Sequence, residues 1–157
     1  MAHTHEQLCL TIAAFLVRDD KVLLVEHPKY SLWLAPGGHI DPGEDTDMAV
    51  YREILEECGY KKEELSFVDG SRSRPMVDTE TRLLMRPEFV DIHQANEHQH
   101  VAFVYYFRVL ADHEPVKSDE HTSMRWFLES ELAGITTRPS VAWYAADALA
   151  RARSDVR

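Results

Sequence analysis

The chain has 157 residues, of which 45% are hydrophobic and 28% are charged, and this size and composition are typical of one soluble globular domain. Its net charge of -10 argues against a nucleic-acid partner, because a polyphosphate backbone is bound by clustered Lys and Arg. Cys9 and Cys58 lie within apolar patterns and are interpreted as buried thiols, and no stretch approaches the roughly 20 apolar residues of a membrane span. We therefore expect a single domain over residues 1–157, located in the cytoplasm and without a membrane partner.

The N-terminal part predicts a β-hairpin that leads into a glycine turn. Leu8–Val17 and Val22–Val25 are apolar, β-branched runs separated by two aspartates, which are frequent turn residues. Leu32–Leu34 is a further short apolar stretch that enters a turn at Gly37 and Gly38. These glycines have two interpretations: they let the backbone approach a phosphate or a metal-bound oxygen, or they only permit the turn.

A capped helix is predicted from about Thr46 to Cys58. Asp45 or Thr46 can accept hydrogen bonds from its first turn, and Gly59 suits the position just beyond its end. At about 100° per residue, one face of this helix is apolar and the opposite face is acidic. The acidic face carries Glu53, Glu56 and Glu57.

These three carboxylates repel one another, and each i,i+4 pair of like charges destabilises a helix slightly. A hard divalent cation would offset the repulsion, because Mg²⁺ takes oxygen ligands and keeps waters and substrate phosphate oxygens in its shell. The alternative is an acidic helix face that is merely solvated, but this leaves the glycines and the isolated Glu44 unexplained. We therefore predict a divalent-metal site on this helix.

Beyond the helix, Leu65–Val68 is a short predicted strand and Asp69–Pro87 is a long polar loop. Loops of this length are often functional. In an acidic protein, several arginines in one loop can hold substrate phosphates, since each offers its donors in a fixed fork. A solvated loop is the alternative. The arginines concerned are Arg72, Arg74 and Arg82.

Val101–Leu110 is the most strand-like run of the chain and is predicted to lie at the centre of the sheet. Just before it, His98 and His100 would share one face of an extended chain. Two alternating histidines are compatible with a transition-metal site, but without a third ligand they do not establish one.

The C-terminal part predicts a strand and two helices. Met124–Leu128 has an apolar strand pattern, and Ser130 can cap a short helix that begins at Glu131. A final helix starts between residues 137 and 140, and its apolar side is expected to pack on the domain. That side comprises Val141, Trp143, Tyr144, Ala148 and Leu149.

The stretch from Gly38 to Tyr60 resembles the signature of the Nudix hydrolase family. The signature reads Gly, five residues, Glu, seven residues, Arg-Glu, an apolar residue, any residue, Glu-Glu, any residue, Gly and an apolar residue. Tyr60 stands where the family usually has an aliphatic residue. The other positions match, through Gly38, Glu44, Arg52, Glu53, Ile54, Glu56, Glu57 and Gly59.

The resemblance implies an α/β fold, the Nudix-like α/β/α sandwich with a mixed β-sheet. It also implies hydrolysis of a phosphoanhydride bond with Mg²⁺ or Mn²⁺ and an attacking water. The substrate would be a small nucleoside diphosphate derivative, either a nucleotide sugar or a noncanonical nucleoside triphosphate. The alternative is a catalytically silent Nudix-like domain that binds a nucleotide or serves regulation. The family is often dimeric, so the resemblance is compatible with a homodimer.

The resemblance also implies roles for individual residues. Arg52 is expected to pair with a glutamate of the signature and fix its orientation, and Glu44 is expected to support the cluster. Metal binding is implied for the side chains of Glu53, Glu56 and Glu57 and for backbone carbonyls at Gly37 and Gly38.

The general base is less defined, because in this family it is either a glutamate of the signature or a carboxylate from a loop outside it. Glu120 and Glu97 are the outside candidates. Glu120 is preferred, because related enzymes often carry an acid shortly before a strand similar to Arg-Trp-Phe. The alternative for each is an ordinary surface carboxylate.

Overall fold

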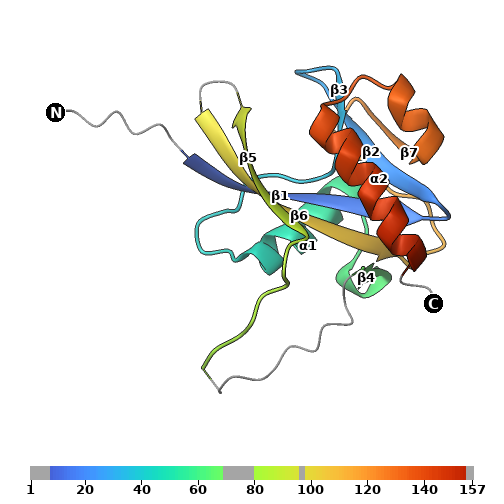
Figure 1. Ribbon diagram of the computed structural model, residues 1–157. Coiled ribbons are helices and arrows are strands. Elements are labelled where there is room, and N and C mark those ends of the chain that lie inside the picture. The colour runs from blue at the N-terminus through green and yellow to red at the C-terminus, as the bar shows by residue number, and fades with distance from the viewer. Residues whose placement is uncertain (1–7, 69–79, 96–97, 155–157) are drawn as a thin grey trace.

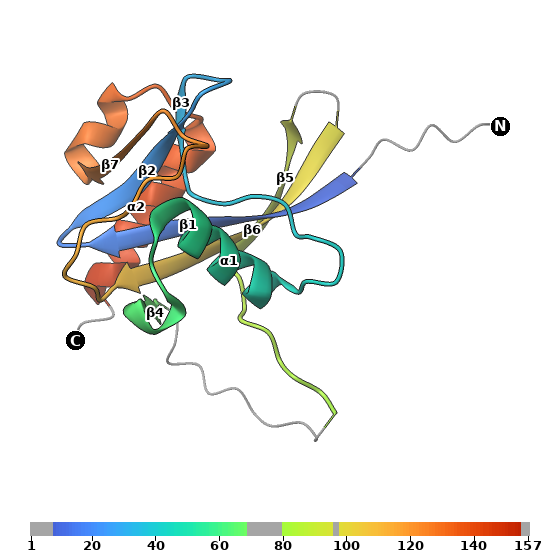
Figure 2. The same cartoon turned by 180° about the vertical axis from the view of Figure 1, so that it is seen from behind.

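A mixed β-sheet lies between two helices in the computed structural model, which describes residues 8–68, 80–95 and 98–154. Helix α2 (Pro139–Ser154) crosses one face of the sheet, as Figure 1 shows, and helix α1 (Thr46–Cys58) lies on the opposite face, which is turned to the viewer in Figure 2. The α/β/α sandwich with a mixed sheet is therefore confirmed. None of the helices in these ranges is long and apolar enough to cross a membrane.

Within the described residues, the sheet has seven strands in the order β3-β2-β1-β6-β4, with β5 paired to β6 and β7 paired to β2. Strands β1 and β6 run parallel, and the other pairs are antiparallel. The strands are β1 (Leu8–Arg18), β2 (Lys21–His27), β3 (Leu32–Leu34), β4 (Leu65–Phe67), β5 (Phe89–Ala95), β6 (His98–Val109) and β7 (Ser123–Leu128).

The predicted hairpin and the predicted central strand are both present. Asp19 and Asp20 adopt positive φ angles of 49° and 58° between β1 and β2, which aspartate tolerates better than most residues. Strand β6 pairs with β1, β4 and β5, so it lies inside the sheet as expected. Strand β5 was not predicted; its exposed positions alternate with more buried ones because one face looks towards solvent.

Helix α1 has the predicted bounds because both of its ends carry local signals. The side chain of Asp45 accepts a hydrogen bond from the backbone N–H of Met48 at 3.0 Å. Gly59 adopts a φ of 74° at the other end, and its N–H is bonded to the carbonyl of Leu55. The apolar side of α1 packs on the sheet through a buried cluster that includes Val50 and Ile54.

Two predictions about the C-terminal part are wrong. Ser130 does not cap a helix, since the short 3-10 helix η2 (Glu129–Gly134) begins directly after Leu128, whose N–H donates to the carboxylate of Glu131 at 2.7 Å. Trp143 of α2 is not buried against the sheet: it is 55% exposed and packs edge-on against Phe89 of β5. The rest of the predicted side of α2 does cover the sheet, through residues such as Ala148 and Leu149.

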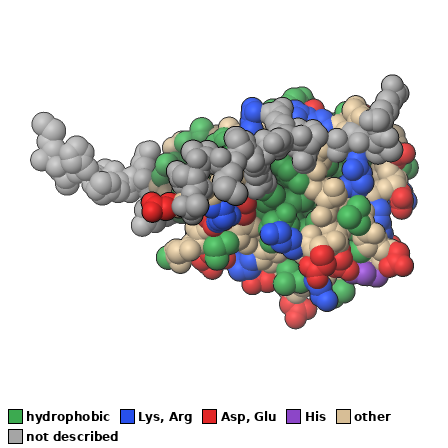
Figure 3. Space-filling model, turned by 90° about the horizontal axis from the view of Figure 1, so that it is seen from below, with side chains coloured by type: hydrophobic (Ala, Val, Ile, Leu, Met, Phe, Trp, Pro, Cys, Tyr) green, Lys and Arg blue, Asp and Glu red, His purple; other side chains and the backbone are tan. Residues whose placement is uncertain are grey.

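The surface mixes charges of both signs. On the face shown in Figure 3, the drawn Lys and Arg side chains are interspersed with Asp and Glu rather than gathered in one patch. Ion pairs between distant segments account for part of this pattern, for example Arg153 with Asp20 at 3.0 Å and with Glu129 at 2.9 Å. Exposed pairs of this kind contribute little to stability.

Candidate metal and catalytic site

The guanidinium group of Arg52 connects the start of the Nudix-like signature to the acidic face of α1. Arg52 Nε lies 2.7 Å from Glu44 Oε1, and Nη2 lies 2.9 Å from Glu44 Oε2. Its Nη1 donates to Glu53 at 2.8 Å and to Glu56 at 3.1 Å, while Nη2 also donates to the carbonyl of His39 at 3.0 Å. The hydrogen bonds from Arg52 hold the pKa of Glu44 below its usual range. Arg52 thus has the position of an internal brace for these carboxylates.

Replacing Arg52 with glutamine is expected to weaken both folding and turnover. Three carboxylates would lose their shared partner, and the free energy of unfolding should fall by about 1–3 kcal/mol, less than for a fully buried pair because Arg52 and Glu56 are partly solvated. Turnover should fall by about 10–100-fold, as is usual when a group that orients metal ligands is removed. Denaturant unfolding and steady-state kinetics measure the two effects.

The matched control for this variant is Arg153→Gln, which removes a guanidinium that also bridges two carboxylates, Asp20 and Glu129, far from α1's acidic face. It should leave both quantities nearly unchanged. Added Mg²⁺ should restore more stability to Arg52→Gln than to the native chain, because a cation offsets the same repulsion. Native stability and turnover in Arg52→Gln would contradict the bracing role.

The carboxylate of Glu53 is buried directly behind the glycine turn. Glu53 is 8% exposed, and burial raises the pKa of its carboxyl despite the hydrogen bond from Arg52, with Glu57 and Glu56 adding to the rise. A Cβ placed on Gly38 would lie 2.4 Å from Glu53 Oε1. Position 38 is therefore glycine because any larger residue would displace this carboxylate.

Gly37 holds the second buried glutamate. Its N–H donates to Glu57 Oε2 at 2.9 Å, and Glu57 is only 3% exposed. Gly37 has a φ of 152°, and a Cβ there would lie 2.2 Å from the carbonyl oxygen of Ile12. The turn is anchored on β1 by further backbone bonds, from Ile12 N to Gly38 O at 2.9 Å and from Ala14 N to Pro36 O at 2.8 Å. The glycines thus do more than permit a turn, since they allow close contact with β1 and with Glu53.

Replacing Gly38 with alanine should impair catalysis more than folding. The new Cβ would push away the carboxylate of Glu53, which is the end of a flexible side chain, so the backbone need not move. We expect turnover to fall by about 10–100-fold and the free energy of unfolding to change by less than about 1 kcal/mol. Kinetics and thermal unfolding, run beside Gly134→Ala, test this, because a Cβ at Gly134 meets no atom within 4 Å. Equal activity of the two variants would contradict the prediction.

These residues fit a hard divalent cation. Glu53 and Glu57 are buried carboxylates that face the glycine turn, and Arg52 supplies one positive charge against Glu44, Glu53 and Glu56. Excess negative charge, carboxylate oxygens and nearby backbone carbonyls are the donor set that Mg²⁺ and Mn²⁺ prefer. The arrangement therefore suits the metal that the sequence predicts.

Two histidines near Glu57 were missed from the sequence. Nε2 of His121 lies 3.1 Å from Glu57 Oε1, within ion-pair distance when the ring is protonated. Neither ring nitrogen has a hydrogen-bond partner among the described residues. His121 is 8% exposed. Burial lowers the pKa of His27, and its electrostatic interactions with His121 and Lys29 lower the pKa further. The only sequence signal for His121 is that it follows Glu120.

A cavity of about 440 Å³ opens beside the glycine turn. Gly37, Gly38 and Glu57 line it at the turn, and Glu120 lines it from the loop before β7. Glu53 and Glu56 do not line it. Apolar side chains of the sheet, residues at the start of α2 and several histidines complete the wall, including Phe15, Val104, Arg138, Tyr144, His39, His98 and His100. Glu120 is therefore brought to the same space as Glu57, as a candidate base should be.

Of the three predicted phosphate-binding arginines, the structure describes Arg82. Arg82 is ion-paired with Asp45, and its Nη1 lies 3.6 Å from Asp47 Oδ2; the side chain is 62% exposed and does not line the cavity. Two aspartates at the start of α1 attract Arg82 in this structure, and its assignment to substrate phosphates stays a prediction. Arg72, Arg74 and Glu97 lie outside the described residues.

Similarity to known proteins shows the family to which this chain belongs. The profile of the NUDIX domain matches residues 8–151. A protein of Bacillus subtilis (strain 168) whose name refers to an 8-oxo-dGTP diphosphatase is 41% identical over 76 residues, which are 46% of this chain and 50% of the relative. The CTP pyrophosphohydrolase of Escherichia coli (strain K12) is 34% identical over 94 residues, which are 56% of this chain and 69% of the relative. The match thus spans about half the length of the Bacillus relative.

Solved structures agree with the sequence matches. A hydrolase of the NUDIX family from Clostridium perfringens has a TM-score of 0.75 and 26% identity, covering 90% of this chain and 95% of that chain. An Ap4A hydrolase of C. elegans shares the fold, with a TM-score of 0.67 and 19% identity over 94% of this chain and 97% of that chain. Because the domain profile extends over nearly all of the sequence, the chain belongs to the Nudix family.

Proposed function

We propose that this chain is a metal-dependent pyrophosphohydrolase that cleaves a phosphoanhydride bond in a nucleoside diphosphate linked to another group. One observation carries the proposal: the buried pair Glu53 and Glu57 faces a glycine turn, next to a cavity of about 440 Å³. Buried carboxylates without enough countercharge destabilise a fold. Their presence beside a cavity of ligand size indicates a catalytic rather than a structural purpose.

Glu53, Glu57 and the carbonyls at Gly37 and Gly38 would hold Mg²⁺ or Mn²⁺, with Glu56 at the solvent side. When bound, the metal supplies positive charge against the phosphates and lowers the pKa of an attacking water. Gly37 orients Glu57 through its N–H, and Arg52 orients Glu53. Glu120 stands at the cavity wall, where it can accept a proton from water.

The cavity is suited to a small nucleotide. Its wall includes apolar and aromatic side chains that can contact a base. The wall also includes the glycine turn and Glu57, beside which the phosphates would be placed with their metal. The named activities of the two curated relatives concern 8-oxo-dGTP and CTP. They favour a nucleoside triphosphate, noncanonical or not, over a nucleotide sugar as the first substrate to test.

A substrate screen tests the function directly. The purified chain is incubated with Mg²⁺ or Mn²⁺ and a panel comprising 8-oxo-dGTP, CTP, Ap4A, ADP-ribose and UDP-glucose, and the products are separated by anion-exchange chromatography. We expect a nucleoside monophosphate and pyrophosphate from at least one triphosphate, and none after the metal is chelated. Tight nucleotide binding without hydrolysis of any compound would instead support the catalytically silent domain.

A further inference from the structure

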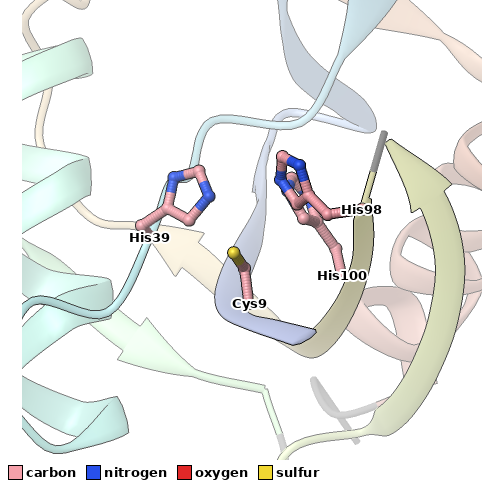
Figure 4. Close-up of side chains that lie close together, drawn as sticks. All are labelled: Cys9, His39, His98 and His100. Carbon is pink, nitrogen blue, oxygen red and sulfur yellow. The ribbon is translucent and has the colours of Figure 1, made fainter. Parts of the chain in front are cut away.

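Four metal-ligating side chains from three segments meet at one end of the sheet (Figure 4). Cys9 comes from the start of β1, His98 and His100 come from the start of β6, and His39 directly follows the glycine turn. One ligand atom of each residue lies within 4.8 Å of those of the other three. The Nε2 atoms of His98 and His100 are 3.0 Å apart. The rings therefore converge on one point rather than turning to solvent separately.

Backbone pairing explains why these residues meet. The parallel register of β1 and β6 places Cys9 opposite His100, and two residues along β6 His98 projects from the same face. An isolated bridge joins Thr11 to His39, and the N–H of Ile40 donates to the carbonyl of Leu10 at 3.0 Å. The sheet therefore supplies the third and fourth ligands that the sequence pattern of His98 and His100 lacked.

We propose that Cys9, His39, His98 and His100 form a site for one transition-metal ion, with Zn²⁺ as the preferred ion. One thiolate and three imidazoles form a set of soft and borderline ligands that suits tetrahedral Zn²⁺, whereas Mg²⁺ prefers the oxygens around Glu53. Ordinary Zn–S and Zn–N bond lengths put tetrahedral ligand atoms about 3.3–3.6 Å apart. Side-chain rotations would have to bring the more distant ligand atoms, now within 4.8 Å of one another, to that spacing and to separate the Nε2 atoms of His98 and His100 slightly.

A network next to the cluster supports the site. The ring of His93 lies 5.5 Å from that of His100, and its Nδ1 is 2.8 Å from Asp91 Oδ1. Asp91 also accepts a hydrogen bond from the hydroxyl of Tyr144 at 2.7 Å. The network fixes His93, whose ring packs edge-on against that of His100 and so limits the movement of one proposed ligand.

The place of His39 gives the site a structural role. His39 adjoins Gly38, so an ion bound here would tie the glycine turn to the first residues of β1 and β6. The proposed ligands are distinct from Glu53, Glu56 and Glu57, but His39, His98 and His100 line the same cavity as Glu57. The test of Zn²⁺ binding therefore uses a spectrum rather than hydrolysis, so that it can fail separately from the proposed function.

Titration with Co²⁺, a spectroscopic substitute for Zn²⁺, tests the proposal. The full chain is freed of metal with a chelator and titrated while its absorption spectrum is recorded. We expect one equivalent of Co²⁺ to produce a thiolate-to-cobalt charge-transfer band and intense visible bands typical of tetrahedral Co²⁺. Zn²⁺ should displace Co²⁺ and remove the bands, whereas a large excess of Mg²⁺ should not.

Variants locate the ion within the chain. Cys9→Ser should abolish the charge-transfer band, and Cys58→Ala, which removes the other of the two cysteines, should keep it. His100→Ala should weaken Co²⁺ binding by more than the about 10–100-fold loss typical of removing an outer hydrogen-bond partner. His113→Ala, which alters a histidine paired with Glu64 elsewhere on the surface, should bind as the native chain does.

Three results would overturn the proposal. These are a native chain without the thiolate band, a band that survives Cys9→Ser, and a Co²⁺ spectrum that Mg²⁺ removes. The last would place the ion among the glutamates. Circular dichroism of each variant shows whether a lost band reflects a lost ligand or a lost fold; if Cys9→Ser does not fold, the His100→Ala and His113→Ala pair decides.

Discussion

Glutamine in place of Glu57 is expected to lower kcat/KM by about 100–1000-fold, while the chain stays folded. The substitution removes one negative charge from the buried carboxylate pair at the glycine turn. Loss of one well-placed electrostatic group typically lowers the rate by about 10²–10³-fold. The amide oxygen can still accept the hydrogen bond from Gly37, so the turn has no reason to unfold. Steady-state kinetics across a Mg²⁺ titration, together with thermal unfolding, measures both effects.

The control for this variant is Glu63→Gln, which makes the same chemical change at an exposed carboxylate of the 3-10 helix η1 (Lys62–Glu64). It should retain native kinetics. If Glu57→Gln turned over at the native rate with the same Mg²⁺ dependence, Glu57 would not be a metal ligand. The assignment of the buried pair would then have to be abandoned.

Glu120→Gln is expected to lower kcat by about 10²–10⁴-fold with little change in KM, as for loss of a general base. Glu120 is exposed and lines the cavity with Glu57, so the substitution should leave stability unchanged. The acid limb of the pH profile of kcat/KM should also disappear, because the group that must lose its proton is gone. Initial rates over a range of pH test both statements.

Asp119→Asn is the adjacent control for Glu120→Gln, since Asp119 is exposed and does not line the cavity. Native turnover in Glu120→Gln would remove Glu120 from the mechanism. The base would then be sought among the glutamates of α1. The two variants separate a base in the loop before β7 from a base in the signature.

Local signals made the helix and its acidic face predictable. Asp45 and Gly59 define the ends of α1 within the sequence itself, and the spacing of Glu53 and Glu57 is sufficient to place both on one face. The contact of Gly38 with Glu53 could not be predicted from the sequence, because it depends on how the turn folds back over the helix. The helix and its acidic face, which depend on neighbouring residues, were therefore predicted. The contact between Gly38 and Glu53, which depends on the tertiary fold, was not.

Long-range pairing accounts for the features that sequence reasoning missed. Cys9 carries no signal of its own and becomes a candidate ligand only through the register of β1 with β6. His121 faces Glu57 because the loop before β7 returns across the end of α1. The ion pairs of Arg82 were not predictable for the same reason, since nothing local shows that Arg82 lies beside the start of α1, where Asp45 and Asp47 attract it.

The backbone bonds of the glycine turn also bear on solubility. Strand β1 pairs with β2 only from Leu16 to Arg18, so the first part of that edge would expose unpaired N–H and carbonyl groups to other chains. The turn covers this edge through bonds to Leu10, Ile12 and Ala14. Unprotected strand edges invite intermolecular pairing. Changes that loosen the glycine turn should therefore promote aggregation as well as reduce activity. Solubility and activity are thus constrained by the same few residues.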